Sequence, residues 1–118
     1  MSVVRALVFL VLAAQGAAAQ QAVSAAPGAV LRGLDKVNGQ TQDIEISAGS
    51  VASFGPLVIE LAACRFPVGN PSGDAFAQMS ISEDGQRLFS GWMVASAPAL
   101  SAMDHPRYDI WVMRCATS

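Results

Sequence analysis

The sequence predicts an all-β domain, built as a compact antiparallel β-sandwich or a partly open barrel of about seven short strands. From Val30 onward no long stretch keeps apolar residues at helical spacing. Short runs rich in β-branched residues alternate instead with turn signals about every 8 to 12 residues. A sheet must bury one apolar face, and stacking and closure both achieve this, so the sandwich and the barrel stay open as alternatives.

The first 19 residues predict a cleavable secretory signal peptide. Arg5 provides the positive region, Ala6 to Ala14 the apolar region, and Gly16 to Ala19 the small residues that precede cleavage before Gln20. An uncleaved membrane anchor is the alternative, but Gln15 interrupts the apolar run and a membrane span needs about 20 apolar residues. We therefore expect a periplasmic or secreted protein with no stable membrane span after cleavage.

Residues 20–29 are rich in Ala, Gln and Ser and end in Pro27-Gly28, which predicts a flexible lead-in. Residues 30–118 then form a single β-rich domain, because a chain of this length leaves no room for a second core. Its first element is a hairpin with strands Leu31 to Val37 and Gln40 to Ile46. We expect a type I′ turn at Asn38-Gly39, because these residues tolerate positive φ angles.

The middle of the chain predicts two strands and a long loop. A turn at Ala48-Gly49 precedes a short strand from Val51 to Phe54, and Gly55-Pro56 separates it from a longer strand, Leu57 to Arg65. The segment Phe66 to Asp74 contains two prolines and two glycines, so we expect it to be a loop.

The last third predicts a second hairpin and a final strand. The hairpin runs from Phe76 to Ser96 and turns at Asp84-Gly85. Residues 97–103 are long enough for one helical turn, capped by Ser96 or Ser101. In the final strand, Tyr108 to Cys115, apolar residues occur on both faces, so we expect this strand to be central and covered on both sides.

Cys64 and Cys115 are the two cysteines, and an exported protein reaches an oxidising compartment in which cysteines usually pair. Their bond would close a loop of 52 residues, counting 64 to 115 inclusive. The chain-entropy model gives about 4 kcal/mol of stabilisation for such a loop. A reactive thiol or metal ligand is the alternative, but neither cysteine has CxxC spacing.

The charge pattern excludes nucleic acid as a partner. The formal net charge is −2, and removal of Arg5 makes it about −3. A nucleic-acid surface needs clustered basic residues that follow the phosphates. The remaining basic residues are scattered among acids: Arg32, Lys36, Arg65, Arg87, Arg107 and Arg114.

His105 is the single histidine and the residue on which an enzymatic interpretation would centre. Ser101, His105 and a neighbouring Asp are the residue types of a catalytic triad. His105, Asp104 and Asp109 are residue types that could bind a metal ion. A triad is defined by geometry, however, and zinc sites usually recruit more His or Cys. The sequence therefore identifies no catalytic residue, metal ligand or cofactor, and it favours a role for His105-Pro106 in ordering the chain before the last strand.

Glu60 lies within an apolar strand, where an ionised carboxylate is costly without a partner. Either it faces solvent, which we favour, or it pairs with an arginine such as Arg114. Neither interpretation is catalytic, because a paired-carboxylate hydrolase needs two positioned acids.

Both tryptophans and the single tyrosine lie near the end of the chain. Large aromatic residues usually belong to the core of a small domain, but an exposed group of them would form the default ligand or partner patch. The residues of this binding patch are Trp92, His105, Tyr108, Asp109 and Trp111.

The chain contains several short motifs that occur together. In its second half they are Phe89-Ser90-Gly91-Trp92-Met93, Ser96-x-Pro98-Ala99-Leu100 and His105-Pro106-x-Tyr108-Asp109-x-Trp111-x-x-x-Cys115. Earlier come Leu34-Asp35-Lys36 with Gly39, Phe54-Gly55-x-Leu57, and Cys64 followed by a Pro/Asn-rich loop and Ala75-Phe76. In combination they resemble domain of unknown function 2155 (DUF2155), roughly from Val30 to Cys115. The resemblance implies a small exported β-rich domain of Gram-negative bacteria with paired cysteines, and it implies no reaction, ligand or cofactor.

The sequence favours a periplasmic, non-enzymatic binding or interaction module for an envelope protein or complex. Two alternatives stay open. One is a small periplasmic hydrolase or metal-dependent enzyme centred on His105. The other is an inhibitor of a secreted hydrolase, which would make its contacts through the loop Phe66 to Asp74.

Overall fold

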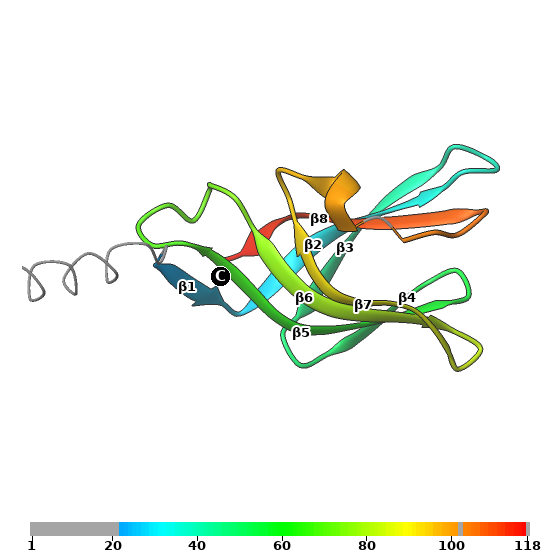
Figure 1. Cartoon of the computed structure of the whole chain (residues 1–118), viewed down its shortest axis with the longest axis horizontal. Coiled ribbons are helices and arrows are strands. Elements are labelled where there is room, and N and C mark those ends of the chain that lie inside the picture. The colour runs from blue at the N-terminus through cyan, green and yellow to red at the C-terminus, as the bar shows by residue number, and fades with distance from the viewer. Residues whose placement is uncertain (1–21, 102, 118) are drawn as a thin grey trace, which may run out of the picture.

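The computed structural model describes residues 22–101 and 103–117 and shows a sandwich of two antiparallel sheets (Figure 1). The predicted all-β class is confirmed, with one strand more than expected. The strands are β1 (Val23–Ala26), β2 (Gly28–Asp35), β3 (Thr41–Ser47), β4 (Val51–Phe54), β5 (Leu57–Pro67), β6 (Phe76–Glu83), β7 (Gln86–Val94) and β8 (Tyr108–Ala116), and the 3-10 helix η2 (Pro98–Ser101) precedes β8.

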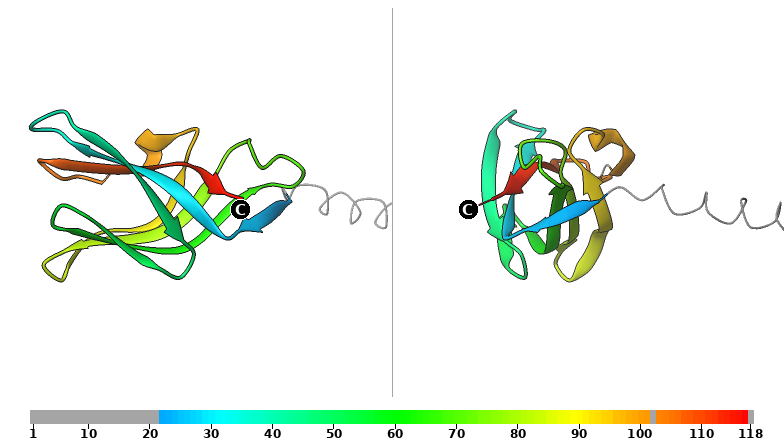
Figure 2. Two further views of the ribbon diagram at one scale, coloured as in Figure 1. Left: turned by 180° about the vertical axis from the view of Figure 1, so that it is seen from behind. Right: turned by 90° about the vertical axis from the view of Figure 1, so that its left-hand side faces the viewer.

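The two layers contain five and three strands (Figure 2). In the five-stranded sheet, β5, β6 and β7 follow one another, and the free edge of β5 pairs with both β1 and β4. In the three-stranded sheet, β2 lies between β3 and β8. The turns of the hairpins β2–β3, β4–β5 and β6–β7 project together from one end, which we call the hairpin end (Figure 1).

The expected flexible lead-in overlaps two strands. Val23–Ala26 pair with β5, and β2 already begins at Gly28. Pro27 separates the two strands, so the chain passes from one sheet to the other within a single residue. The composition of residues 20–29 indicates polarity and small size, but it does not reveal that β5 has an open edge beside them.

The first hairpin is present, but the predicted type I′ turn at Asn38-Gly39 is wrong. A four-residue loop, 36–39, connects the strands, and the Asp35 N–H donates to Gln40 O at 2.9 Å. A type I′ turn needs two residues at positive φ, and here only Gly39 has one, at 75°. The Asp35 side chain stabilises the longer loop by accepting a hydrogen bond from the Val37 N–H at 3.0 Å.

The second hairpin has the two-residue turn that the sequence predicts. Asp84 and Gly85 have φ angles of 50° and 78°, and Glu83 pairs with Gln86 across the turn. These angles are typical of the type I′ turn, whose twist matches that of the flanking strands.

Two further boundaries differ in detail. β5 continues to Pro67 because β1 pairs with Phe66 and Pro67, so the predicted loop starts two residues later than expected. The predicted helical turn is η2, but Ser96 does not cap it, because its Oγ donates to Asp74 Oδ2 at 2.6 Å. In the described part of the chain, no helix is long and apolar enough to cross a membrane.

A β-bulge precedes each cysteine and turns it into the core. In β5 the register with β6 passes from Leu61 to Ala63, and in β8 the register with β2 passes from Val112 to Arg114. One extra residue reverses the alternation of side chains, so Cys64 and Cys115 both point inward.

The expectation that the last strand is central is wrong. β8 lies at the edge of the three-stranded sheet, where β2 is its hydrogen-bonded neighbour. Ile110, Val112 and Cys115 are all buried on its inner side, whereas Trp111 projects outward. The bulge explains the error, because a strict period of two had placed Cys115 on the same face as Trp111.

The predicted disulfide is confirmed and joins the two sheets. Cys64 on β5 and Cys115 on β8 are bonded, with their Cα atoms 5.8 Å apart. Both residues are buried among the aliphatic side chains that fill the space between the layers.

The disulfide should contribute a large part of the stability. We expect replacement of Cys64 and Cys115 by Ala to lower the free energy of unfolding by about 4 kcal/mol, because the unfolded chain regains the freedom of the closed loop. Urea denaturation of the wild type, with and without a reductant, and of the double variant would measure this change. The reductant should leave the double variant unaffected, and equal midpoints for oxidised wild type and double variant would contradict the prediction.

Candidate functional site

The structure does not gather the five residues of the predicted patch on one surface. Trp92 projects from the outer face of the five-stranded sheet, because it alternates with a buried residue of β7. Trp111 and Asp109 project from the outer face of the three-stranded sheet. His105 and Tyr108 lie near the hairpin end, with their ring centroids 5.3 Å apart. The patch is thus divided among three surfaces.

His105 uses both ring nitrogens to hold the chain before β8. Its Nδ1 accepts hydrogen bonds from the main-chain N–H groups of Arg107 and Tyr108, both at 3.0 Å. Because Nδ1 is an acceptor, the ring proton lies on Nε2, which donates to Glu83 Oε2 at 3.0 Å. Only 11% of the His105 side chain is exposed. These contacts fix residues 105–108, which is the role that the sequence favoured for this histidine.

Asp35, at the end of β2, ties the first hairpin to the same segment. Its buried carboxylate accepts hydrogen bonds from Arg107 Nη2 at 3.0 Å and from the Val37 N–H at 3.0 Å. The hydrogen bond from Arg107 is the main cause that holds the pKa of Asp35 below its ordinary value, while burial acts in the opposite direction. The Lys36 N–H also donates to the Arg107 carbonyl at 2.7 Å, and Lys36 Nζ donates to the His105 carbonyl.

A small cleft of about 200 Å³ opens beside this cluster. Asp35 and the polar residues 40–42 line one side, and Phe54, Gly55 and Tyr108 line the other. The Phe54 and Tyr108 rings pack edge to face, 5.7 Å apart. A Cβ atom at position 55 would come within 3.2 Å of the Tyr108 ring, so glycine allows the β4–β5 turn to approach it.

The polar side chains of Ser101 and of the cluster around His105 are bonded to the main chain or to one another. Ser101, the serine of the hypothetical triad, donates to the Trp92 carbonyl at 2.8 Å, and both nitrogens of His105 are engaged elsewhere. Among residues 22–101 and 103–117, no three His, Cys, Asp or Glu side chains converge as metal ligands. The described contacts therefore give Ser101 and His105 structural roles.

Exposed apolar side chains lie at several separate positions on the outer face of the five-stranded sheet, which we call the five-stranded face. It carries four of the seven large apolar residues that are exposed in the described chain: Val23, Val51, Val58 and Trp92. The half-buried Phe76 and Val94 pair with each other on the same face. The Arg65 guanidinium lies 5.1 Å from the centroid of the Trp92 ring. Exposed Trp and Arg are the residue types that most often dominate protein–protein binding energy.

Sequence reasoning identified Trp92 but missed the rest of this face. Arg65, Phe76 and Trp92 come from three different strands, and only the register of β5, β6 and β7 makes them neighbours. The signal that could have found them is the alternation of side chains along each strand. Arg65 and Trp92 are each adjacent in sequence to a buried residue, so both point to the outer face.

Glu60 also projects from the five-stranded face and is exposed, as the favoured interpretation held. The alternative pairing with Arg114 is wrong, because Arg114 projects from the outer face of the other sheet. Within the described residues, neither Glu60 nor Arg65 forms an ion pair or a side-chain hydrogen bond. With the exposed Arg87, which pairs with Ser82 nearer the hairpin end, the face therefore carries one acid and two bases that form no ion pair within the described residues.

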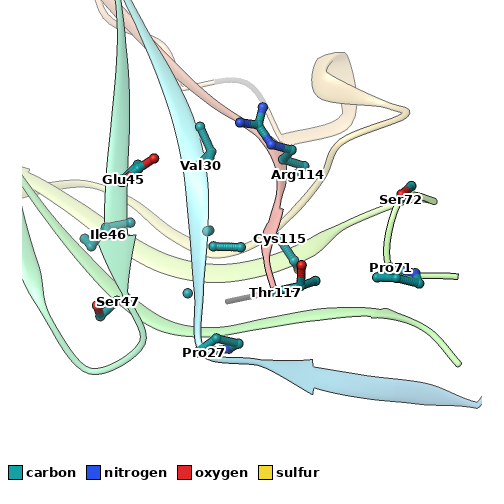
Figure 3. Close-up of a pocket in the computed structure, with 13 residues that line it drawn as sticks. Pro27, Val30, Glu45, Ile46, Ser47, Pro71, Ser72, Arg114, Cys115 and Thr117 are labelled. Carbon is teal, nitrogen blue, oxygen red and sulfur yellow. The ribbon is translucent and has the colours of Figure 1, made fainter. Parts of the chain in front are cut away.

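A larger hollow of about 700 Å³ lies on the opposite side, over the three-stranded sheet near the disulfide (Figure 3). Two outward-facing residues of its lining, Gly28 and Ala116, pair with each other and have little or no side chain to fill the hollow. Glu45 and Arg114 stand on either side of Val30, and Ser72 of the β5–β6 loop closes one side. The hollow is polar and contains charges of both signs, and no set of side chains converges in it on a single ligand group.

We expect His105→Ala to act on stability. The substitution removes the partner of two main-chain N–H groups and of Glu83, so the free energy of unfolding should fall by about 1 to 3 kcal/mol. Asp104→Ala is the matched control, because this neighbour is exposed and should change stability by less than about 0.5 kcal/mol. Urea denaturation measures both, and equal effects of the two substitutions would contradict the structural role of His105.

Acid should weaken the Asp35–Arg107 pair. Because the folded pKa of Asp35 is lowered, its stabilisation is complete above the unfolded pKa, near 4, and is lost as the pH falls through the lower folded value. Asp35→Asn should therefore be less stable than the wild type at neutral pH and should lose less stability on acidification. Urea denaturation at neutral pH and below pH 3 measures both losses; equal losses would show that Asp35 does not contribute to the acid sensitivity.

Comparison with known proteins supports the motif-based resemblance. A family model described as "Uncharacterized protein conserved in bacteria (DUF2155)" matches residues 29–115. The uncharacterized protein RP359 of Rickettsia prowazekii (strain Madrid E) is 33% identical over 87 residues, which cover 70% of this chain and 56% of the relative. This chain therefore spans little more than half the length of that relative. No solved structure matches the chain. Because the matched residues run from the start of β2 to Cys115 on β8, the chain belongs to the DUF2155 family of uncharacterized bacterial proteins.

Proposed function

We propose that this chain is an exported, non-enzymatic binding module that recognises a protein of the bacterial cell envelope through its five-stranded face. The observation that carries the proposal is the group formed there by the exposed Arg65 and Trp92, which contact each other, with the half-buried Phe76 and Val94 in the neighbouring row. Exposed Trp and Arg side chains that lie together on a surface commonly mark a protein–protein binding site. Arg65 adds five N–H donors that no other described residue occupies.

The polar residues support a binding role rather than a catalytic one. A general base needs a nitrogen or oxygen that can reach a substrate proton, whereas the His105 nitrogens bind Glu83 and the main chain. Asp35 is likewise held by Arg107 and the Val37 N–H.

Two features support export. The first 19 residues have the pattern of a secretory signal peptide. The buried Cys64–Cys115 disulfide is a kind of bond that persists in oxidising compartments and is rare in the cytosol.

The test is photo-crosslinking in cells that express the full chain with a benzophenone amino acid in place of Gln78. This exposed residue lies on the five-stranded face, between Ala63 and Trp92. The matched control carries the same group in place of Glu45, which is exposed on the outer face of the other sheet. We expect a heavier adduct in the envelope fraction from position 78 only, and its loss when Trp92→Ala is added.

Mass spectrometry of the adduct identifies the bound protein, and N-terminal sequencing of the exported chain should give Gln20 as its first residue. Circular dichroism of each variant verifies that it folds. Adducts of equal yield from positions 78 and 45, or none from either, would refute the five-stranded face as the binding surface. Recovery of the chain in the cytosolic fraction alone would refute export.

A further inference from the structure

We infer that the protein bound by the five-stranded face is a second copy of this chain, in a two-fold symmetric dimer held by Arg65 of each copy and Glu60 of the other. The inference rests on the proposed function, because it names the partner of the same surface.

Three neighbouring rows of paired residues cross the middle of the face. The central row contains Ala63, Gln78 and Trp92. On one side of it, Arg65 pairs with Phe76 and Phe76 with Val94; on the other, Glu60 pairs with Ser80 and Ser80 with Ser90. Along β6 the central row is two residues from each flanking row, about 7 Å in either direction.

A two-fold axis that lies along the central row, between two stacked copies, brings opposite charges together. Rotation about this axis places β5 of the second copy antiparallel to β5 of the first and exchanges the two flanking rows. Arg65 then faces Glu60 of the other copy, and the symmetry repeats the pair. A two-fold interface requires such self-complementarity, and both groups lack an ion-pair partner within the described chain.

The residues on the axis suit contact with their own symmetry mates. The Gln78 amide has both donors and an acceptor, so two copies can hydrogen-bond to each other. Trp92 is 38% exposed and can stack on its mate while Arg65 stays over its ring. Ala63 is small, so it allows the two β5 strands to approach at about the 10 Å spacing of packed sheets.

The plan area of the face is of the same order as the area that a dimer interface buries. Four adjacent strands about 4.8 Å apart and eight residues long cover about 500 Å² in plan, and projecting side chains increase the accessible area. A standard interface buries about 800 Å² on each partner. On the outer face of the three-stranded sheet, Arg32 is already paired with Asp43 at 2.7 Å.

Charge reversal with sedimentation equilibrium tests the dimer, using full chain expressed and exported by cells. The wild type should sediment at twice the mass of the chain. Glu60→Arg and Arg65→Glu, each alone, should raise the dimer dissociation constant about 100-fold, because like charges then face each other. The double variant should dimerise again. An equimolar mixture of the two single variants should form a heterodimer, because one copy then carries two arginines and the other two glutamates.

The outcomes separate this inference from the proposed function. A monomeric wild type, or single variants that dimerise as well as the wild type, overturns the dimer. If the monomer still gives a Trp92-dependent crosslink to a different protein from position 78, the proposed function stands and the dimer fails. If no protein is crosslinked, both fail. A monomer that sediments with vesicles of anionic lipid would also overturn the dimer.

Discussion

The disulfide between Cys64 and Cys115 is a covalent cross-link between the two sheets of the sandwich. A domain of this size buries a limited fraction of its surface, so a cross-link between its layers has a large effect on the balance of folding. The bulges in β5 and β8 are what make the link feasible, because they reverse the phase of each strand just before its cysteine. Leu61 and Cys64 are three residues apart on β5, and so are Val112 and Cys115 on β8, yet all four are buried in the core. With strict alternation, residues three apart would point to opposite faces of the sheet.

The hairpin end lies beyond the reach of that bond and is held by polar contacts. Arg107, His105 and Lys36 connect the first hairpin, the end of β6 and the start of β8 through charge-assisted and main-chain hydrogen bonds. The charged side chains at this end therefore stabilise the fold by holding these segments together. Glu60 and Arg65 of the five-stranded face form no ion pair or side-chain hydrogen bond in the described chain, which is why that face, and not the histidine, carries the proposals on binding.

The sequence was sufficient for features that depend on local chemistry and insufficient for those that depend on register. Asp84-Gly85 makes its two-residue turn because nothing else competes for the chain there, whereas at Asn38-Gly39 the Asp35 carboxylate stabilises a longer loop. The cysteine pairing followed from their number and the expected compartment. The five-residue patch did not hold together, because strands and loops place its members on three surfaces, and no local pattern encodes which strands become neighbours.

The four residues of β1 protect the edge of β5 through their main chain. Only Ala26 among them is buried, so β1 contributes mainly main-chain hydrogen bonds to the edge of β5. Without β1, the segment Cys64 to Pro67 would present unpaired main-chain groups next to Phe66, which is the kind of edge on which other chains assemble. Proteolytic trimming of β1 would therefore leave the core largely intact and yet convert the domain into a template for aggregation.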